Sequence, residues 1–250
     1  MNKKIGIGII DIYDDDSISN ILKHIPEEAY VSIVTSRKSN LKFDKNITHQ
    51  IVDNVSLAFI KNLLLHDFRM KEIEHYFILH SDQNVENQEI YSSIIKKAEV
   101  FGTWFLTGSM QNNVDIEDDN GEILKISPEL NSKFIYTFKG IVKNNGFFSE
   151  RYINGQNLHV LDYIEKLRKN NLFLPSGHFS TISVDMTENK KNMTNCYIKD
   201  FPDPDKTLQY AYGYFMHKHQ YIPGQNDPKP VSKEEMLKKL EELQKNYAKR

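Results

Sequence analysis

Apolar and polar positions alternate in blocks along the first hundred residues of the chain. Short, continuous apolar runs in this region are typical of strands that are buried on both faces of a sheet. These runs cover residues 5–13, 30–35, 47–52, 76–80 and 100–107. Apolar residues at helical spacing separate them, at residues 17–25, 55–70 and 90–98. The alternation predicts an α/β fold with a mostly parallel central sheet flanked by helices.

The pattern changes after residue 110. Asn120 and Gly121 lie between two apolar runs, which is a strong hairpin signal, and a further strand is expected over residues 133–142. Residues 158–167 carry leucine and isoleucine at helical spacing. Residues 177–230 hold five prolines and are expected to be rich in loops. We expect part of this stretch, residues 201–230, to be a mobile lid that orders over a ligand.

A final helix is predicted to begin at Ser232, in a capping box completed by Glu235. Its apolar stripe is consistent either with packing against its own domain or with self-association through the helix. These patterns divide the chain into an α/β half (residues 1–110), a smaller hairpin- and loop-rich half with the lid (111–230) and a C-terminal amphipathic helix (231–250). We expect the three parts to form one compact domain.

Composition narrows the function classes. The 32 basic and 34 acidic residues give a net charge of −2, which argues against a protein that clamps bare nucleic acid, although a local basic groove is compatible with it. The single cysteine, Cys196, excludes an intramolecular disulfide and a cysteine-rich zinc site. No apolar run is long enough to span a membrane, so we expect a cytoplasmic protein. Dinucleotide-binding, P-loop and nucleophile-elbow glycine motifs are all missing from the sequence.

The most informative unit is the predicted strand at residues 76–80, which ends in His80, Ser81 and Asp82. In open α/β sheets, ligands bind at the carboxyl ends of the strands. A carboxylate at that position can hold a divalent cation, which in turn neutralises a diphosphate leaving group. We expect Asp82 to be such a carboxylate, in a loop beside water. The alternative is an aspartate that only begins a turn.

Two later units carry further candidate chemistry. His159 and Asp162 are three residues apart on a predicted helix, where a carboxylate can act as general base towards a hydroxyl; the alternative is a solvated helix face. Residues 212–219 alternate aromatic side chains with His217, Lys218 and His219. This segment is expected either to be a plain surface loop or to bring a histidine to a metal and a lysine to a phosphate.

Taken in order, these stretches resemble glycosyltransferases of the GT-A type, in the broad family-2 group. Residues 9–14 match the first strand of that family and the short segment after it. Residues 54–62 resemble N-x-G-x-A-x-A-R-N, with Ser56 for the glycine and Lys61 for the arginine, and His80-Ser81-Asp82 falls on the D-x-D motif. Residues 146–167 resemble the G-x-F-D-E-x-F…D…R-L region, and residues 214–223 resemble a late Y-x-x-K-x-G-x-x-P segment.

The resemblance implies transfer of a sugar from a nucleoside-diphosphate sugar to the hydroxyl of a glycan, protein, small molecule or modified DNA. It implies a Mn²⁺ or Mg²⁺ ion held by Asp82, His80, His217 and His219. The residues expected to bind the donor are Asp11, Tyr13, Thr35, Ser36, Lys61, Asn62 and Lys218. Asp162 and His159 are the expected catalytic pair, and loss of Asp82 is expected to abolish turnover and weaken donor binding. The alternatives are a non-catalytic binding or assembly module of the same fold and a nucleotidyltransferase.

Overall fold

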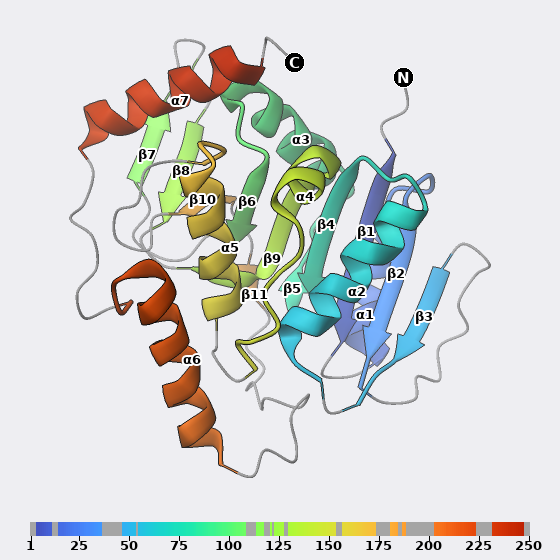
Figure 1. Ribbon diagram of the computed structural model, residues 1–250. Coiled ribbons are helices and arrows are strands. Elements are labelled where there is room, and N and C mark those ends of the chain that lie inside the picture. The colour runs from blue at the N-terminus through green and yellow to red at the C-terminus, as the bar shows by residue number, and fades with distance from the viewer. Residues whose placement is uncertain are drawn as a thin grey trace.

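Within the part of the chain that the structure describes, nine strands form one mixed sheet in the order β3-β2-β1-β4-β9-β6-β10-β8-β7 (Figure 1). The structure is a computed structural model. It describes residues 4–11, 15–36, 47–53, 55–108, 114–117, 121, 123–127, 130–153, 157–173, 181–184, 187–188, 203–223 and 232–247. The predicted α/β architecture, with helices around a largely parallel sheet, is confirmed.

The first half of the sheet is parallel. It contains β1 (Ile5–Asp11), β2 (Tyr30–Thr35), β3 (Ile47–Ile51) and β4 (His75–His80). Every residue of β1 and β4 is buried, because helices cover both faces of the sheet. Parallel pairing also brings the carboxyl ends of these strands to one edge, where β1, β2 and β4 end in Asp11, Thr35 and His80.

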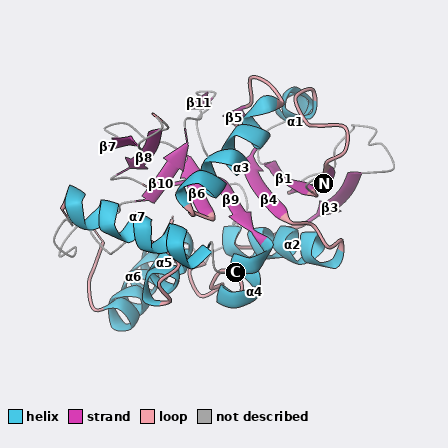
Figure 2. Cartoon of the chain, turned by 90° about the horizontal axis from the view of Figure 1, so that it is seen from above, coloured by secondary structure: helices cyan, strands magenta, loops and turns pink. Residues whose placement is uncertain are grey.

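Helices cover the sheet on two sides. Figure 2 shows α1 (Asp15–Leu22) and α3 (Glu89–Phe101) on one face and α2 (Leu57–Met70), α4 (Lys139–Asn145) and α5 (Leu158–Lys169) on the other. The Ser56 hydroxyl caps α2 by accepting a hydrogen bond from the Phe59 amide at 3.1 Å. Since α2 follows β3 and returns to β4, its first turns lie at the carboxyl edge of the sheet.

One antiparallel strand joins the two halves of the chain. β9 (Asn131–Phe138) lies between β4 and β6 (Phe105–Gly108) and is antiparallel to both. Beyond β6 come β10 (Thr181–Val184) and the predicted hairpin, which is confirmed as β7 (Val114–Glu117) and β8 (Ile123–Ser127). Two short strands, β5 (Gln83–Asn84) and β11 (Thr187–Glu188), pair separately. Because β9 is antiparallel to β4, its first residues lie at the carboxyl edge.

Three elements differ from the sequence prediction. The strand expected from residue 100 begins only at Phe105, because α3 continues to Phe101 and ends on a left-handed Gly102. The strand expected to reach residue 142 ends at Phe138, where α4 follows. The prediction that residues 177–230 are rich in loops is wrong over α6 (Pro204–His219), since Asp203 caps this helix and Pro204 occupies its first turn, where proline is tolerated. The lid motion itself remains a prediction.

The last helix, α7 (Lys233–Tyr247), packs against the chain's own domain. Leu240 and Leu243 are buried, and the Gln244 side chain donates a hydrogen bond to the Val100 carbonyl at the end of α3. The Ser232 hydroxyl accepts a hydrogen bond from the Glu235 amide, as the capping box predicts. None of the described helices is both long enough and apolar enough to cross a membrane.

Candidate functional site

Polar side chains at the carboxyl edge of β1 and β2 are buried and hydrogen-bonded. Asp11 Oδ1 accepts a hydrogen bond of 2.8 Å from the Ser81 hydroxyl, which follows β4. The Thr35 hydroxyl at the end of β2 lies 3.0 Å from His49 Nε2 on β3. Ser36 comes directly after Thr35 and is half-buried, whereas Tyr13 lies outside the described residues. Asp11 and Thr35 therefore occupy the edge that the sequence predicted.

Asp82 forms an ion pair with a residue that the sequence analysis missed. Its Oδ2 accepts a hydrogen bond of 2.8 Å from Lys133 Nζ. Lys133 arrives there because β9 pairs with β4 in a register that sets Phe134 beside Leu79. The side chain of Asp82 is only 1% exposed, so the expected loop carboxylate beside water is wrong. Directly after Asp82, the chain pairs as β5 with β11.

Lys61 is a completely buried lysine from the first turns of α2. Its Nζ lies 2.9 Å from the carbonyl oxygen of Ser132 and 3.1 Å from His159 Nε2. Within the described part of the chain, the ammonium has only these neutral partners and no carboxylate. Burial without a counter-charge lowers the pKa of Lys61 to about 7. An anion placed beside it would therefore be strongly favoured.

His80 has a neutral imidazole close enough to Lys61 and Lys133 to be affected by their charges. Burial lowers its pKa well below the ordinary value, and the nearby charges of Lys61 and Lys133 lower it further. Neither ring nitrogen of His80 has a hydrogen-bond partner among the described residues, and the same holds for both amide atoms of the buried Gln83. We call Lys61, His80, Asp82, Gln83 and Lys133 the sheet-edge cluster. It combines two lysines with polar groups that lack partners, which is costly in a buried site unless a ligand supplies them.

The start of α5 is fixed to the same edge. Asn157 lies just before the helix, where it accepts a hydrogen bond from the Ser132 hydroxyl and donates one of 3.0 Å to the Leu130 carbonyl. This attachment places His159, in the first turn, against Lys61. The ring of His159 also packs edge-on against Phe148. The expected catalytic residue His159 thus belongs to the surroundings of the sheet-edge cluster.

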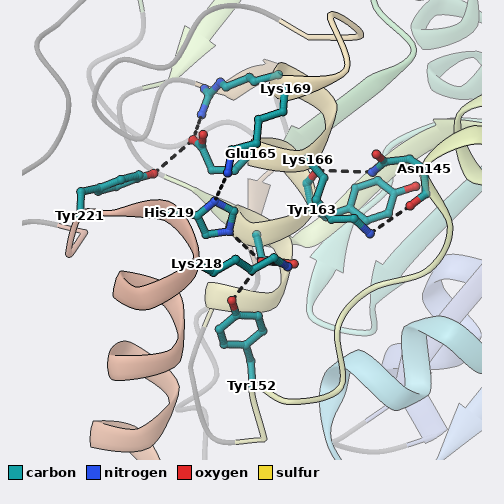
Figure 3. Close-up of polar contacts among 11 residues, drawn as sticks. Asn145, Tyr152, Tyr163, Glu165, Lys166, Lys169, Lys218, His219 and Tyr221 are labelled. Atoms are coloured by element: carbon teal, nitrogen blue, oxygen red, sulfur yellow. Dashed lines mark hydrogen bonds and ion pairs between the residues drawn. The ribbon is translucent and has the colours of Figure 1, made fainter.

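A second polar cluster lies between α5 and α6. Asp162 is fully buried, and its Oδ1 accepts hydrogen bonds from the Tyr152 hydroxyl at 3.0 Å, Lys218 Nζ at 2.5 Å and His219 Nε2 at 2.8 Å. Figure 3 shows Tyr152, Lys218 and His219 converging from the loop before α5 and from α6. We call these four residues the α5–α6 cluster. Burial alone would raise the pKa of Asp162, but the hydrogen bonds from His219 and Lys218 hold it below the ordinary value.

Polar contacts beyond Asp162 also hold α6 in place. Glu165 Oε1 accepts hydrogen bonds from Arg168 at 2.5 Å and from the Tyr221 hydroxyl at 3.1 Å (Figure 3). The second oxygen of Asp162, Oδ2, has no hydrogen-bond partner among the described residues. The carboxylate therefore anchors α6 through one oxygen and keeps the other available as an acceptor.

The described residues do not bring the four expected metal ligands together. His219 is bound to Asp162, and His217 is exposed on α6. No group of three histidine, cysteine, aspartate or glutamate side chains within the described ranges could hold a metal ion. Asp82 is already paired with Lys133, and both Lys61 and Lys133 act on His80, so a divalent cation would meet two like charges. This donor set does not fit Mn²⁺ or Mg²⁺.

Asn62 and Lys218, two of the expected donor-binding residues, already have protein partners. Asn62 donates to the Phe148 carbonyl at 3.0 Å, accepts from the Phe148 amide at 2.9 Å and donates to Glu150 at 2.8 Å. It lines a surface hollow of about 430 Å³ together with the side chains of α2 and of the loop after α4. Asn62 shapes this loop, and Lys218 neutralises Asp162.

Comparison with known proteins gives limited similarity. No family model and no characterised sequence matches the chain. The mannosyltransferase PcManGT from Pyrobaculum calidifontis, solved with GDP-Man and Mn²⁺, is 10% identical over 100% of this chain and 76% of its own, with a TM-score of 0.46. S. aureus TarS is 15% identical over 65% of this chain, with a TM-score of 0.44, and A197 from STIV is 12% identical over 56%, with a TM-score of 0.35.

The matched region spans 34% of TarS and 67% of A197. With all three TM-scores below 0.5, these similarities do not decide what the chain does.

Proposed function

We propose that the chain is a glycosyltransferase, which moves a sugar from a nucleoside-diphosphate sugar to an acceptor hydroxyl. The observation that carries this proposal is the sheet-edge cluster. It places the buried Lys61 and the partly exposed Lys133 near a neutral histidine whose ring nitrogens have no partner among the described residues. The cluster lies at the carboxyl ends of parallel strands, where α/β sheets bind ligands. A diphosphate supplies both the negative charge and the hydrogen-bond acceptors that such a cluster lacks.

The proposed reaction divides between the two clusters. The acceptor oxygen forms a bond to the anomeric carbon while the bond from that carbon to the diphosphate oxygen breaks. The nucleoside diphosphate leaves with the electron pair, and Lys61 and Lys133 stabilise its charge. The proton of the acceptor hydroxyl passes to Asp162 Oδ2, which has no hydrogen-bond partner within the described residues.

The helix α5 connects these two roles. His159 contacts Lys61, and Asp162 follows three residues later, about one turn along the same helix. A donor bound at the sheet edge and an acceptor bound towards α6 would therefore meet along α5. Asp11, Thr35 and Ser36 would line the nucleoside side of the site, because β1 ends at Asp11 and β2 ends at Thr35, directly before Ser36, at the same edge.

A screen of nucleotide sugars tests the proposal. The full chain is incubated with UDP- and GDP-linked sugars, and mass spectrometry detects slow release of the nucleoside diphosphate. We expect release from at least one donor, and loss of that release in Asp162→Asn when an acceptor is present. Calorimetric binding of UDP or GDP without release from any donor would favour a non-catalytic binding module. The proposal would be contradicted if the chain neither binds UDP or GDP nor releases a nucleoside diphosphate from any donor.

A further inference from the structure

We propose that Lys61 and Lys133 take the place of a divalent cation, so that the sheet-edge cluster binds the diphosphate of a nucleotide directly. The inference rests on the proposed function, because it concerns the donor of the same reaction. It adds that binding of the diphosphate needs the lysine side chains and does not need a metal ion.

The charges of the cluster support direct binding. Lys61 is buried with only a carbonyl oxygen and an imidazole nitrogen as partners in the described structure. Lys133 is held 2.8 Å from Asp82 and acts on His80 from the neighbouring strand. The two lysines come from α2 and β9, and an anionic ligand beside them favours the charged form of Lys61. Phosphate oxygens accept charge-assisted hydrogen bonds from such ammonium groups.

The neutral groups of the cluster complete a diphosphate site. His80 is uncharged, so one of its ring nitrogens carries a proton that it can donate, and the Gln83 amide can donate as well. Both side chains are buried and have no partner among the described residues. A ligand approaches from the Lys133 side, because the Lys133 side chain is 18% exposed while that of Asp82 is 1% exposed.

A divalent metal ion would require oxygen ligands that are not already paired with a cation. Divalent magnesium and manganese prefer several carboxylate, carbonyl or water oxygens. Here the Asp82 carboxylate is neutralised by Lys133, and His219 is occupied by Asp162. In this account Asp82 holds Lys133 in position until the diphosphate replaces it as the partner of the lysine.

The test needs no variant at first. Binding of UDP and of GDP to the full wild-type chain is measured by isothermal titration calorimetry, once in EDTA and once in excess Mn²⁺. We expect a Kd in EDTA within about twofold of that in Mn²⁺. Binding that requires Mn²⁺, or that tightens by about tenfold or more with it, would overturn the lysine assignment and leave the proposed function intact. No binding under either condition would overturn both.

Two variants sharpen the result in EDTA. Lys133→Met should weaken nucleotide binding at least about tenfold, the loss of one charge-assisted hydrogen bond, while the exposed Lys143→Met on α4 serves as the matched control and changes nothing. Asp82→Asn removes the carboxylate that competes with the diphosphate for Lys133, so nucleotide binding in EDTA should tighten by about threefold. A metal site would instead lose its Mn²⁺-dependent affinity in Asp82→Asn. Circular dichroism melts verify that each variant is folded.

Discussion

Two polar clusters adjoin α5 about one turn apart, at His159 and at Asp162, and their charge balance differs. In the sheet-edge cluster, Lys61 has no carboxylate partner within the described structure, and neutral His80 has no hydrogen bond there. In the α5–α6 cluster, a single carboxylate oxygen of Asp162 collects three donors. The first cluster therefore has unused donors, whereas the second is nearly satisfied by the protein itself.

This difference indicates that the sheet-edge cluster is a ligand site. The α5–α6 cluster mainly holds α6 in place and retains one oxygen that can accept a hydrogen bond. Buried donors without partners cost folding free energy unless a ligand satisfies them, so the sheet-edge cluster is the better candidate for an anion. The satisfied oxygen of Asp162 holds α6 against α5, and its second oxygen is left for a proton. In the proposed reaction, the lysines of the sheet-edge cluster thus stabilise the leaving diphosphate, and Asp162 accepts the proton of the acceptor hydroxyl.

The largest expected effect is on turnover in Asp162→Asn. Asparagine keeps an oxygen that can accept the hydrogen bonds of α6, but it cannot take a proton from the acceptor hydroxyl. We expect turnover to fall at least about 100-fold while donor affinity stays unchanged. Transfer rate and donor affinity are measured on one preparation, with the exposed Asp205→Asn on α6 as control. Full activity in Asp162→Asn would remove this residue from the chemistry and leave it a docking role.

The next effect is a pH dependence that belongs to Lys61. Its pKa of about 7 in the folded chain lies below its ordinary value of 10.5. The charged form binds the diphosphate, so nucleotide affinity should be highest below pH 7 and fall by up to about tenfold per pH unit above it.

The stability of the fold should change with pH in the opposite direction to nucleotide affinity. Since the unfolded chain binds more protons than the folded chain between about pH 7 and 10.5, Lys61 should make the free energy of unfolding rise with pH in that window. Titration calorimetry and urea unfolding across this range check both trends, with Lys61→Met as the variant that should flatten them. Equal slopes in wild type and Lys61→Met would contradict the assignment.

A smaller effect is expected on stability from Lys218→Met. The lysine donates to a buried carboxylate, and its loss should lower the free energy of unfolding by about 1.5 kcal/mol, since His219 and Tyr152 still bind Asp162. Urea denaturation measures the change, and limited proteolysis reports whether α6 has loosened. A variant as stable as wild type would mean that Lys218 contributes nothing to docking.

The smallest effect is expected from Tyr152→Phe. This change removes one of three hydrogen bonds to Asp162 Oδ1 without leaving a new unpaired group, so the expected loss is about 1 kcal/mol. The same urea experiment detects it. A loss larger than that of Lys218→Met would reverse the order of importance within the α5–α6 cluster.

The parts of the fold that the sequence predicted are those set by local patterns. β1 and β4 are continuous apolar runs, and their polar ends at Asp11 and His80 lie where parallel pairing requires. The helix α6 is not evident from the sequence, because Pro202 and Pro204 are typical of a loop, although Pro204 occupies the first turn, where proline is compatible with a helix.

The missed site residues depend on long-range pairing. Lys133 is 51 positions from Asp82, and only the insertion of β9 beside β4 brings the two together. His217 and His219 looked equivalent in the sequence, but residues two apart lie on different faces of a helix. His219 is therefore bound to Asp162, whereas His217 is exposed. No local pattern distinguishes these cases without knowledge of how α6 packs.

The proposed donor site is the sheet-edge cluster and not the α5–α6 cluster. The most direct test titrates UDP and GDP into Lys61→Met and Lys218→Met side by side at pH 6.5, where the Lys61 ammonium is mostly charged in the wild type. We expect affinity at least about tenfold weaker in Lys61→Met and within about twofold of wild type in Lys218→Met. Wild-type affinity in Lys61→Met together with lost affinity in Lys218→Met would contradict this expectation and assign the diphosphate to α6.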